Sequence, residues 1–93
     1  MDSNYSSNPN KKESDQRQSE NISVLVLHND DIHTFEYVME SLEEVCDHNQ
    51  VQAEQCAMIA HYKGKCDILT GEYTTLRRIR KQLSARGLHV TLT

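Results

Sequence analysis

Residues 27–38, LHNDDIHTFEYV, place five hydrogen-bonding side chains directly after an apolar run. The five are His28, Asn29, Asp30, Asp31 and His33. Imidazoles, carboxylates and an amide oxygen can hold a metal ion, transfer a proton or bind a cationic ligand. The stretch contains no glycine or proline, so several polar groups converge on a chain with little built-in flexibility. We therefore expect a polar site here, and the question is which of the three chemistries it serves.

Spacing argues against two of these chemistries. Neighbouring residues seldom converge on one metal ion without a glycine-rich loop, and the alternating acidic positions of an EF-hand are absent. An enzyme remains an alternative, although no nucleophile motif or phosphate-binding glycine loop accompanies the cluster. The residues of such a metal-dependent or acid–base enzyme would be His28, Asp30, Asp31, His33 and His61. A purely structural alternative is a strand-to-helix turn whose polar side chains bond local backbone N–H groups, and the residues alone favour it.

Small side chains form a second unusual group, on a helix that we predict to begin after Asn49 and to end at Gly64. Their spacing of i, i+4, i+7 and i+8 places them on one face. They are Ala53, Ala57, Ala60 and His61. Such a face either packs closely against a neighbour or leaves a hollow beside the helix, and helical spacing alone favours close packing.

The remaining pattern alternates strands and helices. Residues 22–28 are β-rich and suit a central strand, while residues 33–46 have helical period, with His33 or Thr34 as the N-cap. Residues 65–71 predict a strand closed by a turn at Gly71-Glu72, and residues 74–87 predict a helix. Residues 88–93 alternate apolar and polar side chains, as a strand with one buried face does. The predicted class is α+β, in the order βααβαβ: a three-stranded, mostly antiparallel sheet with three helices packed on one side.

Ninety-three residues suffice for one domain, which we expect to span 21–93. Residues 1–20 lack Val, Leu and Ile, so we predict a disordered N-terminal tail. No apolar stretch is long enough for a membrane helix, and the N-terminus has no apolar leader segment, so we expect a cytoplasmic protein without a membrane partner. The three cysteines show no metal-ligand spacing, which predicts reduced, mostly buried thiols and no zinc.

Charge is distributed unevenly along the chain. Residues 1–76 contain all fourteen acidic residues and five basic ones, a net charge of −9, whereas residues 77–93 carry five basic residues and no acidic one. This polarity suggests two different partner surfaces and not a nucleic-acid footprint. A solvated basic helix face is the simpler interpretation of residues 77–81.

Two motifs taken together resemble those of the ClpS family, the adaptors of the bacterial Clp protease. VLHNDDIHTFEYV is followed by AHYKGK, with His61 thirty-two residues after Asn29. The resemblance covers roughly residues 22–93. The predicted order of elements, βααβαβ, is also similar to that of the family. It implies an adaptor and not an enzyme, with no cofactor and no bound metal. The family binds N-degrons, proteins with a free α-amino group and a first residue Leu, Phe, Tyr or Trp, and delivers them to a Clp AAA+ unfoldase.

The resemblance also implies roles for particular residues. The α-amino group, a cation with a reference pKa of about 7.7–8.0, would bind acceptors from Asn29, Asp30, Asp31 and His61. The first side chain would enter an apolar pocket made by His33, Phe35, Ala57 and Ala60. The N-terminal domain of a ClpA- or ClpC-type unfoldase would dock on the basic residues Arg77, Arg78, Arg80 and Lys81. The adaptor itself would act as a monomer, and its N-terminal extension would engage the unfoldase.

Several positions depart from the family pattern. The helix predicted over residues 74–87 lacks the Glu that members often have early in it, where Leu76 and Arg77 stand. Many members have Thr-Pro-Met where His33-Thr34-Phe35 stands, and often a Met where Ala57 stands. Phe35 is stiffer than methionine, which affects selection against β-branched first residues, and Ala57 enlarges the pocket, which favours aromatic first residues over Leu. A module that keeps the fold and has lost degron binding is therefore a further alternative.

Overall fold

The computed structural model describes residues 22–93, and the predicted N-terminal tail, residues 1–20, lies outside the described residues. Six elements follow one another in the predicted order βααβαβ. They are β1 (Ile22–His28), α2 (Phe35–Cys46), α3 (Gln50–Lys63), β2 (Lys65–Glu72), α4 (Tyr73–Ala85) and β3 (Val90–Leu92). In the part of the chain that the structure describes, no helix combines the length and the apolar character needed to cross a membrane.

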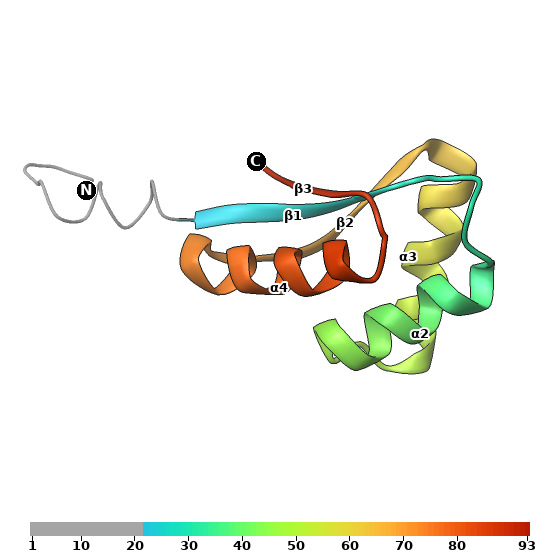
Figure 1. The fold of residues 1–93 in the computed structure, drawn as a ribbon, viewed down its shortest axis with the longest axis horizontal. Helices are drawn as coiled ribbons and strands as arrows, with labels where there is room; N and C mark the ends of the chain where they lie inside the picture. The colour runs from blue at the N-terminus through green and yellow to red at the C-terminus, as the bar shows by residue number, and fades with distance from the viewer. Residues whose placement is uncertain (1–21) are drawn as a thin grey trace, which may run out of the picture.

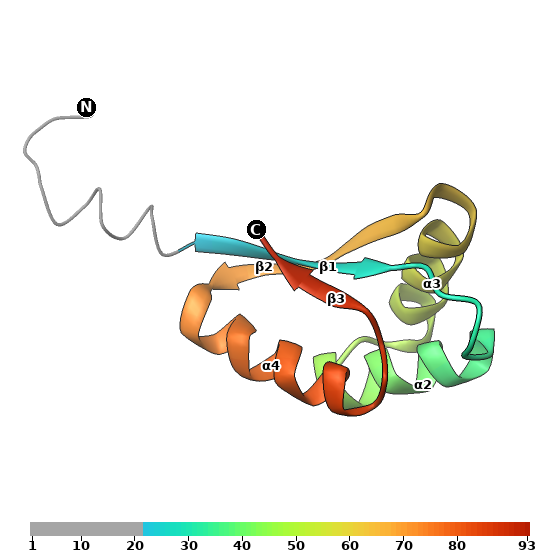
Figure 2. The same cartoon turned by 45° about the horizontal axis from the view of Figure 1, so that its top comes forward.

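The three strands form one sheet in the order β2-β1-β3, and both neighbours of β1 run antiparallel to it. The helices lie on one side of this sheet: α4 runs along it, while α2 and α3 pack together at the end where β1 stops (Figures 1 and 2). The central place of β1 agrees with its β-rich, largely buried sequence. The predicted α+β class is confirmed.

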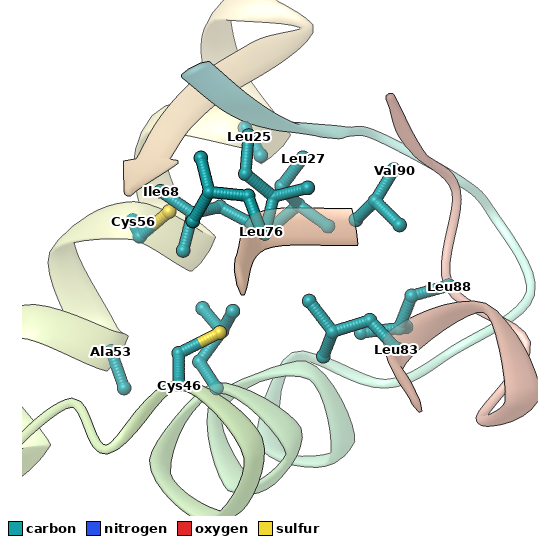
Figure 3. Packing of buried hydrophobic residues seen from close by; sticks show 12 residues of the cluster. Leu25, Leu27, Cys46, Ala53, Cys56, Ile68, Leu76, Leu83, Leu88 and Val90 are labelled. Carbon is teal, nitrogen blue, oxygen red and sulfur yellow. The ribbon is translucent and has the colours of Figure 1, made fainter. Parts of the chain in front are cut away.

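The core fills the space between sheet and helices. Leu25 of β1, Leu42 of α2 and Leu83 of α4 are each completely buried. Figure 3 shows Leu25 beside Leu76 of α4, with side chains of both layers directed into the same interior. Burying a leucine contributes roughly 1.5–3 kcal/mol, so these contacts hold α4 and α2 against the sheet.

Helix ends follow local chemistry. Thr34, not His33, is the N-cap of α2, and its side chain accepts a hydrogen bond from the Tyr37 N–H. Asn49 caps α3 as predicted and forms a capping box with Gln52. Gly64 ends α3 with φ of 95°, a left-handed conformation that disfavours other residues.

The predicted turn at Gly71-Glu72 is wrong. Both residues belong to β2, opposite Ser23 and Ile22 of β1, and α4 begins directly at Tyr73. Because β1 extends back to Ile22, it offers hydrogen-bonding partners to the last two residues of β2, and pairing overrides the turn preference of glycine. β3 is also shorter than predicted, although Leu88 and Val90 are buried as expected.

The three cysteines are free thiols in α2, α3 and β2. Cys46 and Cys56 are buried, and Cys66 is half-buried. Burial raises the pKa of Cys46 to about 11, and burial together with neighbouring Cys66 raises that of Cys56 further. Both buried thiols therefore stay protonated at neutral pH and serve as small core side chains.

Candidate functional site

The two sequence motifs meet where β1 ends. The N–H of Asn29 donates to the carbonyl of Gly64 over 2.9 Å, and His28 pairs with Lys65 at the start of β2. Because Gly64 turns the chain from α3 into β2, the last turn of α3 lies beside the residues that follow β1. This arrangement places His61 next to the Asn-Asp-Asp stretch despite the thirty-two residues between His61 and Asn29.

A hollow of about 470 Å³ opens at this junction. Its lining includes all eight residues predicted to bind a ligand: Asn29, Asp30, Asp31, His33, Phe35, Ala57, Ala60 and His61. The polar members come from the β1–α2 connection and the last turn of α3. The apolar members come from the first turn of α2 and the preceding turns of α3. The volume lies within the range of about 300–1,000 Å³ usual for small-ligand sites.

Asp30 organises the loop that carries the polar groups. Its Oδ1 accepts hydrogen bonds from the backbone N–H groups of Ile32 and His33, both at 2.9 Å. Its Oδ2 lies 3.2 Å from Nδ1 of His33. Burial acts to raise the pKa of Asp30, but the backbone and ring hydrogen bonds outweigh burial and hold the pKa below its ordinary value. The structural alternative thus holds for Asp30, which also keeps a negative charge at the wall of the hollow.

His33 is clamped by three neighbours. Besides its contact with Asp30, its ring stacks on Tyr37 with centroids 4.9 Å apart. A Cβ atom added to Gly87 would lie 2.9 Å from Nε2 of His33, so the turn after α4 packs closely against the imidazole. The hydroxyl of Tyr37 donates to the Arg86 carbonyl over 2.8 Å, which fixes the same turn. The loop at the hollow is therefore tied to the C-terminal end of α4.

The face of α3 predicted to carry three alanines and a histidine is divided. Ala53, Ala57 and Ala60 are buried, whereas His61 is exposed and places its ring edge-to-face against Tyr62, 4.9 Å away. Both alternatives predicted for this face occur, close packing at one end and a hollow at the other, and His61 lines that hollow. Ala57 and Ala60 line the hollow, while Ala53 packs in the core.

His28 faces away from the acidic cluster. Its Nε2 is hydrogen-bonded to Oγ1 of Thr91 at 2.8 Å, and its ring stacks on His89 with centroids 4.5 Å apart. Burial, the neighbouring His89 and Lys65 lower the pKa of His28. Among residues 22–93, no three His, Cys, Asp or Glu side chains are placed to share a metal ion.

Sequence reasoning missed part of the lining. Leu27, Val38, Met58 and Tyr62 also border the hollow, as does His28, one of the five polar residues that follow the apolar run. Helical spacing gave a signal for two of them, since Val38 follows Phe35 by three residues and Met58 precedes His61 by three. Val38 also packs against the core through α2. It is half-buried, with part of its surface left to the hollow.

The predicted docking residues lie on α4. Arg77, Arg78 and Lys81 are exposed, and Arg80 is half-buried, while Leu76 and Leu83 of the same helix are buried. Arg86, at the end of the helix, is engaged elsewhere: its guanidinium contacts Glu44 and donates to Oγ of Ser41. We call Arg77, Arg78, Arg80 and Lys81 the basic face of α4.

Comparison with known proteins agrees with the predicted family. Residues 18–91 match the family described as ATP-dependent Clp protease adaptor protein ClpS. No curated protein matches the chain. A solved structure, Agrobacterium tumefaciens ClpS2 bound to L-phenylalaninamide, is similar with a TM-score of 0.76 and 22% identity, over 78% of this chain and 95% of that one.

The two matches support different conclusions. At 22% identity the structural likeness shows a shared fold, whereas the family match covers most of the chain. The family consists of adaptors, so the prediction of a protein that is not an enzyme is confirmed, and the enzyme alternative is wrong. By its sequence match and its fold, the chain belongs to the ClpS family of Clp protease adaptors.

Proposed function

We propose that this adaptor binds proteins through a free N-terminal amino group and a bulky apolar first residue, and delivers them to a Clp AAA+ unfoldase in the cytoplasm. The observation that carries the proposal is the hollow at the end of β1, which gathers hydrogen-bond acceptors and apolar walls in one place. Such a ligand needs both: its ammonium needs acceptors, and its first side chain needs an apolar enclosure.

The amino group is bound by acceptors of three kinds. Asn29 offers an amide oxygen, His61 a ring nitrogen, and the aspartates carboxylate oxygens. Asp30 keeps its charge beside the hollow because its pKa is lowered. Within residues 22–93, the side chains of Asn29, Asp31 and His61 have no other hydrogen-bond partner, so their acceptors are available. Hydrogen bonds to a charged group contribute roughly 1.5–3 kcal/mol each.

The first side chain occupies the apolar part of the hollow. Ala57 and Ala60 are only 4% and 3% exposed, and Phe35 stands across from them on α2. Methyl walls leave more room than larger side chains would, so we expect Phe, Tyr and Trp to bind more tightly than Leu. The similar ClpS2 structure contains L-phenylalaninamide, a ligand with a free amino group and an aromatic side chain, which supports this assignment. Burial of such a side chain with the amine bonds gives an affinity of about micromolar order.

The basic face of α4 binds an acidic surface on the unfoldase N-terminal domain. Its support is the exposure of Arg77, Arg78 and Lys81 and the charge polarity of the chain. Because these residues come from a different helix than the hollow, a monomeric adaptor holds its substrate and its unfoldase at once. ClpA-type and ClpC-type unfoldases are both candidates for this partner.

The proposal is tested by fluorescence anisotropy with three labelled peptides. One begins with Phe, the second is the same peptide N-acetylated, and the third begins with Val. We expect micromolar or tighter binding of the first alone, because acetylation removes the ammonium charge and Val fills the hollow poorly. Equal or absent binding of all three peptides contradicts the proposal and leaves the alternative of a ClpS fold without degron binding.

Delivery needs a second measurement. A reporter beginning with Phe is incubated with Clp protease and either a ClpA-type or a ClpC-type unfoldase, with and without the adaptor. Faster degradation with one unfoldase identifies the partner. Tight peptide binding without faster degradation by either unfoldase contradicts the delivery half of the proposal.

A further inference from the structure

Helix α3 carries apolar side chains on both of its faces. Its inner face is buried, as described above. Its outer face shows Val51, Met58, Ile59 and Tyr62, of which Val51 is 65% and Tyr62 78% exposed. The spacing of i, i+7, i+8 and i+11 aligns these four on one side of the helix. Single exposed apolar residues are ordinary, but an aligned row on one helix marks a surface that another molecule covers.

This outer face is hollowed along its length. A shallow groove of about 460 Å³ contains the four apolar side chains, and Glu54, Gln55 and Lys63 border it. Glu54 and Lys63 have opposite charges, so the groove has no net charge preference. Its chemistry suits uncharged, apolar side chains. We call this surface the α3 groove.

The α3 groove is continuous with the candidate site. Met58 and Tyr62 line both the groove and the hollow at the end of β1. Tyr62 also touches His61, the predicted ligand of the amino group, through their edge-to-face contact. A polypeptide that begins in the hollow therefore meets the groove at the rim that Met58 and Tyr62 share.

Dimensions fit a short extended segment. The eleven helical steps from Val51 to Tyr62 correspond to about 16 Å of helix at 1.5 Å per residue. An extended chain advances about 3.3 Å per residue, so the groove has room for roughly five residues. Methionine at the shared rim adapts its shape to different side chains.

We propose that the α3 groove binds the residues that follow the first residue of the substrate, roughly the second to the sixth, and prefers apolar side chains among them. This inference rests on the proposed function, because the first residue must occupy the hollow. It adds a second determinant of substrate choice: among substrates with the same first residue, those with an apolar segment after it are held more tightly.

The experiment compares three competitors that share N-terminal phenylalanine. Phenylalaninamide reaches only the hollow, while two hexapeptides differ at positions two to six, apolar in one and Ser/Gln-rich in the other. Each displaces a labelled Phe peptide from the full chain. We expect the apolar hexapeptide to bind about 5- to 20-fold more tightly than the polar one, since several partly exposed apolar side chains gain contact.

Two substitutions locate the effect. Ile59→Gln and Val51→Gln change residues that border the groove and not the hollow. We expect Ile59→Gln to lower the affinity for the apolar hexapeptide about 3- to 10-fold. The affinity for phenylalaninamide should stay within twofold of its original value. Ile22→Gln is the matched control, because Ile22 is equally an exposed isoleucine but lies at the far end of β1. Because both isoleucines are exposed, each variant should retain its circular dichroism spectrum.

The possible outcomes distinguish a failure of the groove inference from a failure of the proposed function. If phenylalaninamide competes and the two hexapeptides bind equally, the groove inference is overturned and the proposed function stands. If phenylalaninamide fails to compete, both are overturned. Sedimentation tests another occupant: a dimer that Ile59→Gln dissociates, with unchanged affinity for all three ligands, would show that the groove binds a second copy of this chain and would overturn the inference.

Discussion

The hollow at the end of β1 and the basic face of α4 differ in how many segments build them. The hollow is lined by β1, the loop after it, α2 and α3, whereas the basic face comes from one helix. A change in the hollow therefore disturbs neighbours through short contacts, such as those of Asp30 with His33. A change on the basic face alters one charge in a screened, solvent-exposed field. Recognition of a small ligand needs convergence, and docking of a large partner needs only a charged surface.

The largest effect is expected from Asp30→Asn. Asparagine can still accept the backbone N–H bonds of the loop, so the substitution removes mainly the charge. Losing a charge-assisted contact of about 1.5–3 kcal/mol lowers the affinity for a Phe peptide roughly 10- to 100-fold. Anisotropy measures the loss. Asp31→Asn is the comparison variant: Asp31 is also a proposed ligand of the amino group, but its charge is exposed and more strongly screened, so we expect a smaller loss. Equal losses for the two variants would contradict the distinct role of Asp30.

Ala57→Met should change which first residue is preferred. Methionine adds three heavy atoms to a wall that is 4% exposed, and overfilling a packed site costs about 1–3 kcal/mol. We expect affinity for a Trp peptide to fall about tenfold and that for a Leu peptide to stay within twofold or improve. Isothermal titration of both peptides checks the ratio. Uniform weakening of both peptides would mean that Ala57 does not set the size of the hollow.

Element-level predictions succeeded because they depend on local physics. The N-cap at Asn49, the glycine at position 64 and the helical period of α2 act within a few residues, and all three predictions hold. The predicted turn at Gly71 failed because pairing with Ser23, forty-eight residues away, decides its conformation. A short stretch of sequence contains no information about which distant strand it will pair with.

The candidate site was predictable only in part. The two motifs contain seven of the eight lining residues predicted from the resemblance, the eighth being Ala57, and the structure brings all eight to one hollow. Spacing alone did not indicate that His33 is clamped by Gly87, because that contact joins the loop to the turn after α4. Nor did it separate Asp30, which holds the loop, from exposed Asp31. Neighbours in sequence diverge in role when only one of them meets the backbone N–H groups of the turn.

The double charge reversal Arg77→Glu with Lys81→Glu should impair docking on the unfoldase without impairing peptide binding in the hollow. Both side chains are exposed, so the fold should persist, and peptide affinity should stay within twofold. Degradation of a Phe reporter should slow about fivefold or more, because like charges would face the acidic surface of the unfoldase. The effect should shrink at high salt. Unchanged degradation at low salt would remove the basic face from docking.

Gly87→Ala tests whether the turn after α4 influences ligand binding in the hollow through its contact with His33. Gly87 has φ of 88°, which disfavours alanine by about 1–2 kcal/mol, and the added methyl would lie 2.9 Å from the His33 ring. We expect the free energy of unfolding, measured in urea, to fall by that amount. We also expect the affinity for a Phe peptide to fall two- to fivefold, because His33 shifts and loosens its contact with Asp30. Gly64→Ala is a control for backbone strain alone, since a Cβ there meets no atom within 4 Å. Equal peptide affinity in the two variants would argue against the His33 contact.

Mild acid should act on the hollow region and not on the basic face, because Arg and Lys stay charged far above pH 7. Burial, His89 and Lys65 lower the pKa of His28 in the folded protein, so the unfolded chain binds more protons below about pH 6.5. Stability contributed by neutral His28 is therefore present above that pH and is lost as pH falls through the lowered pKa. Asp30 acts in a separate, more acidic window: its lowered pKa contributes stability above about pH 4, which is lost as pH falls further. We expect His28→Gln, which can still bond Thr91, to lose less stability than the parent protein between pH 7 and 5 in urea titrations. Parallel losses in both proteins would show that other groups govern this window.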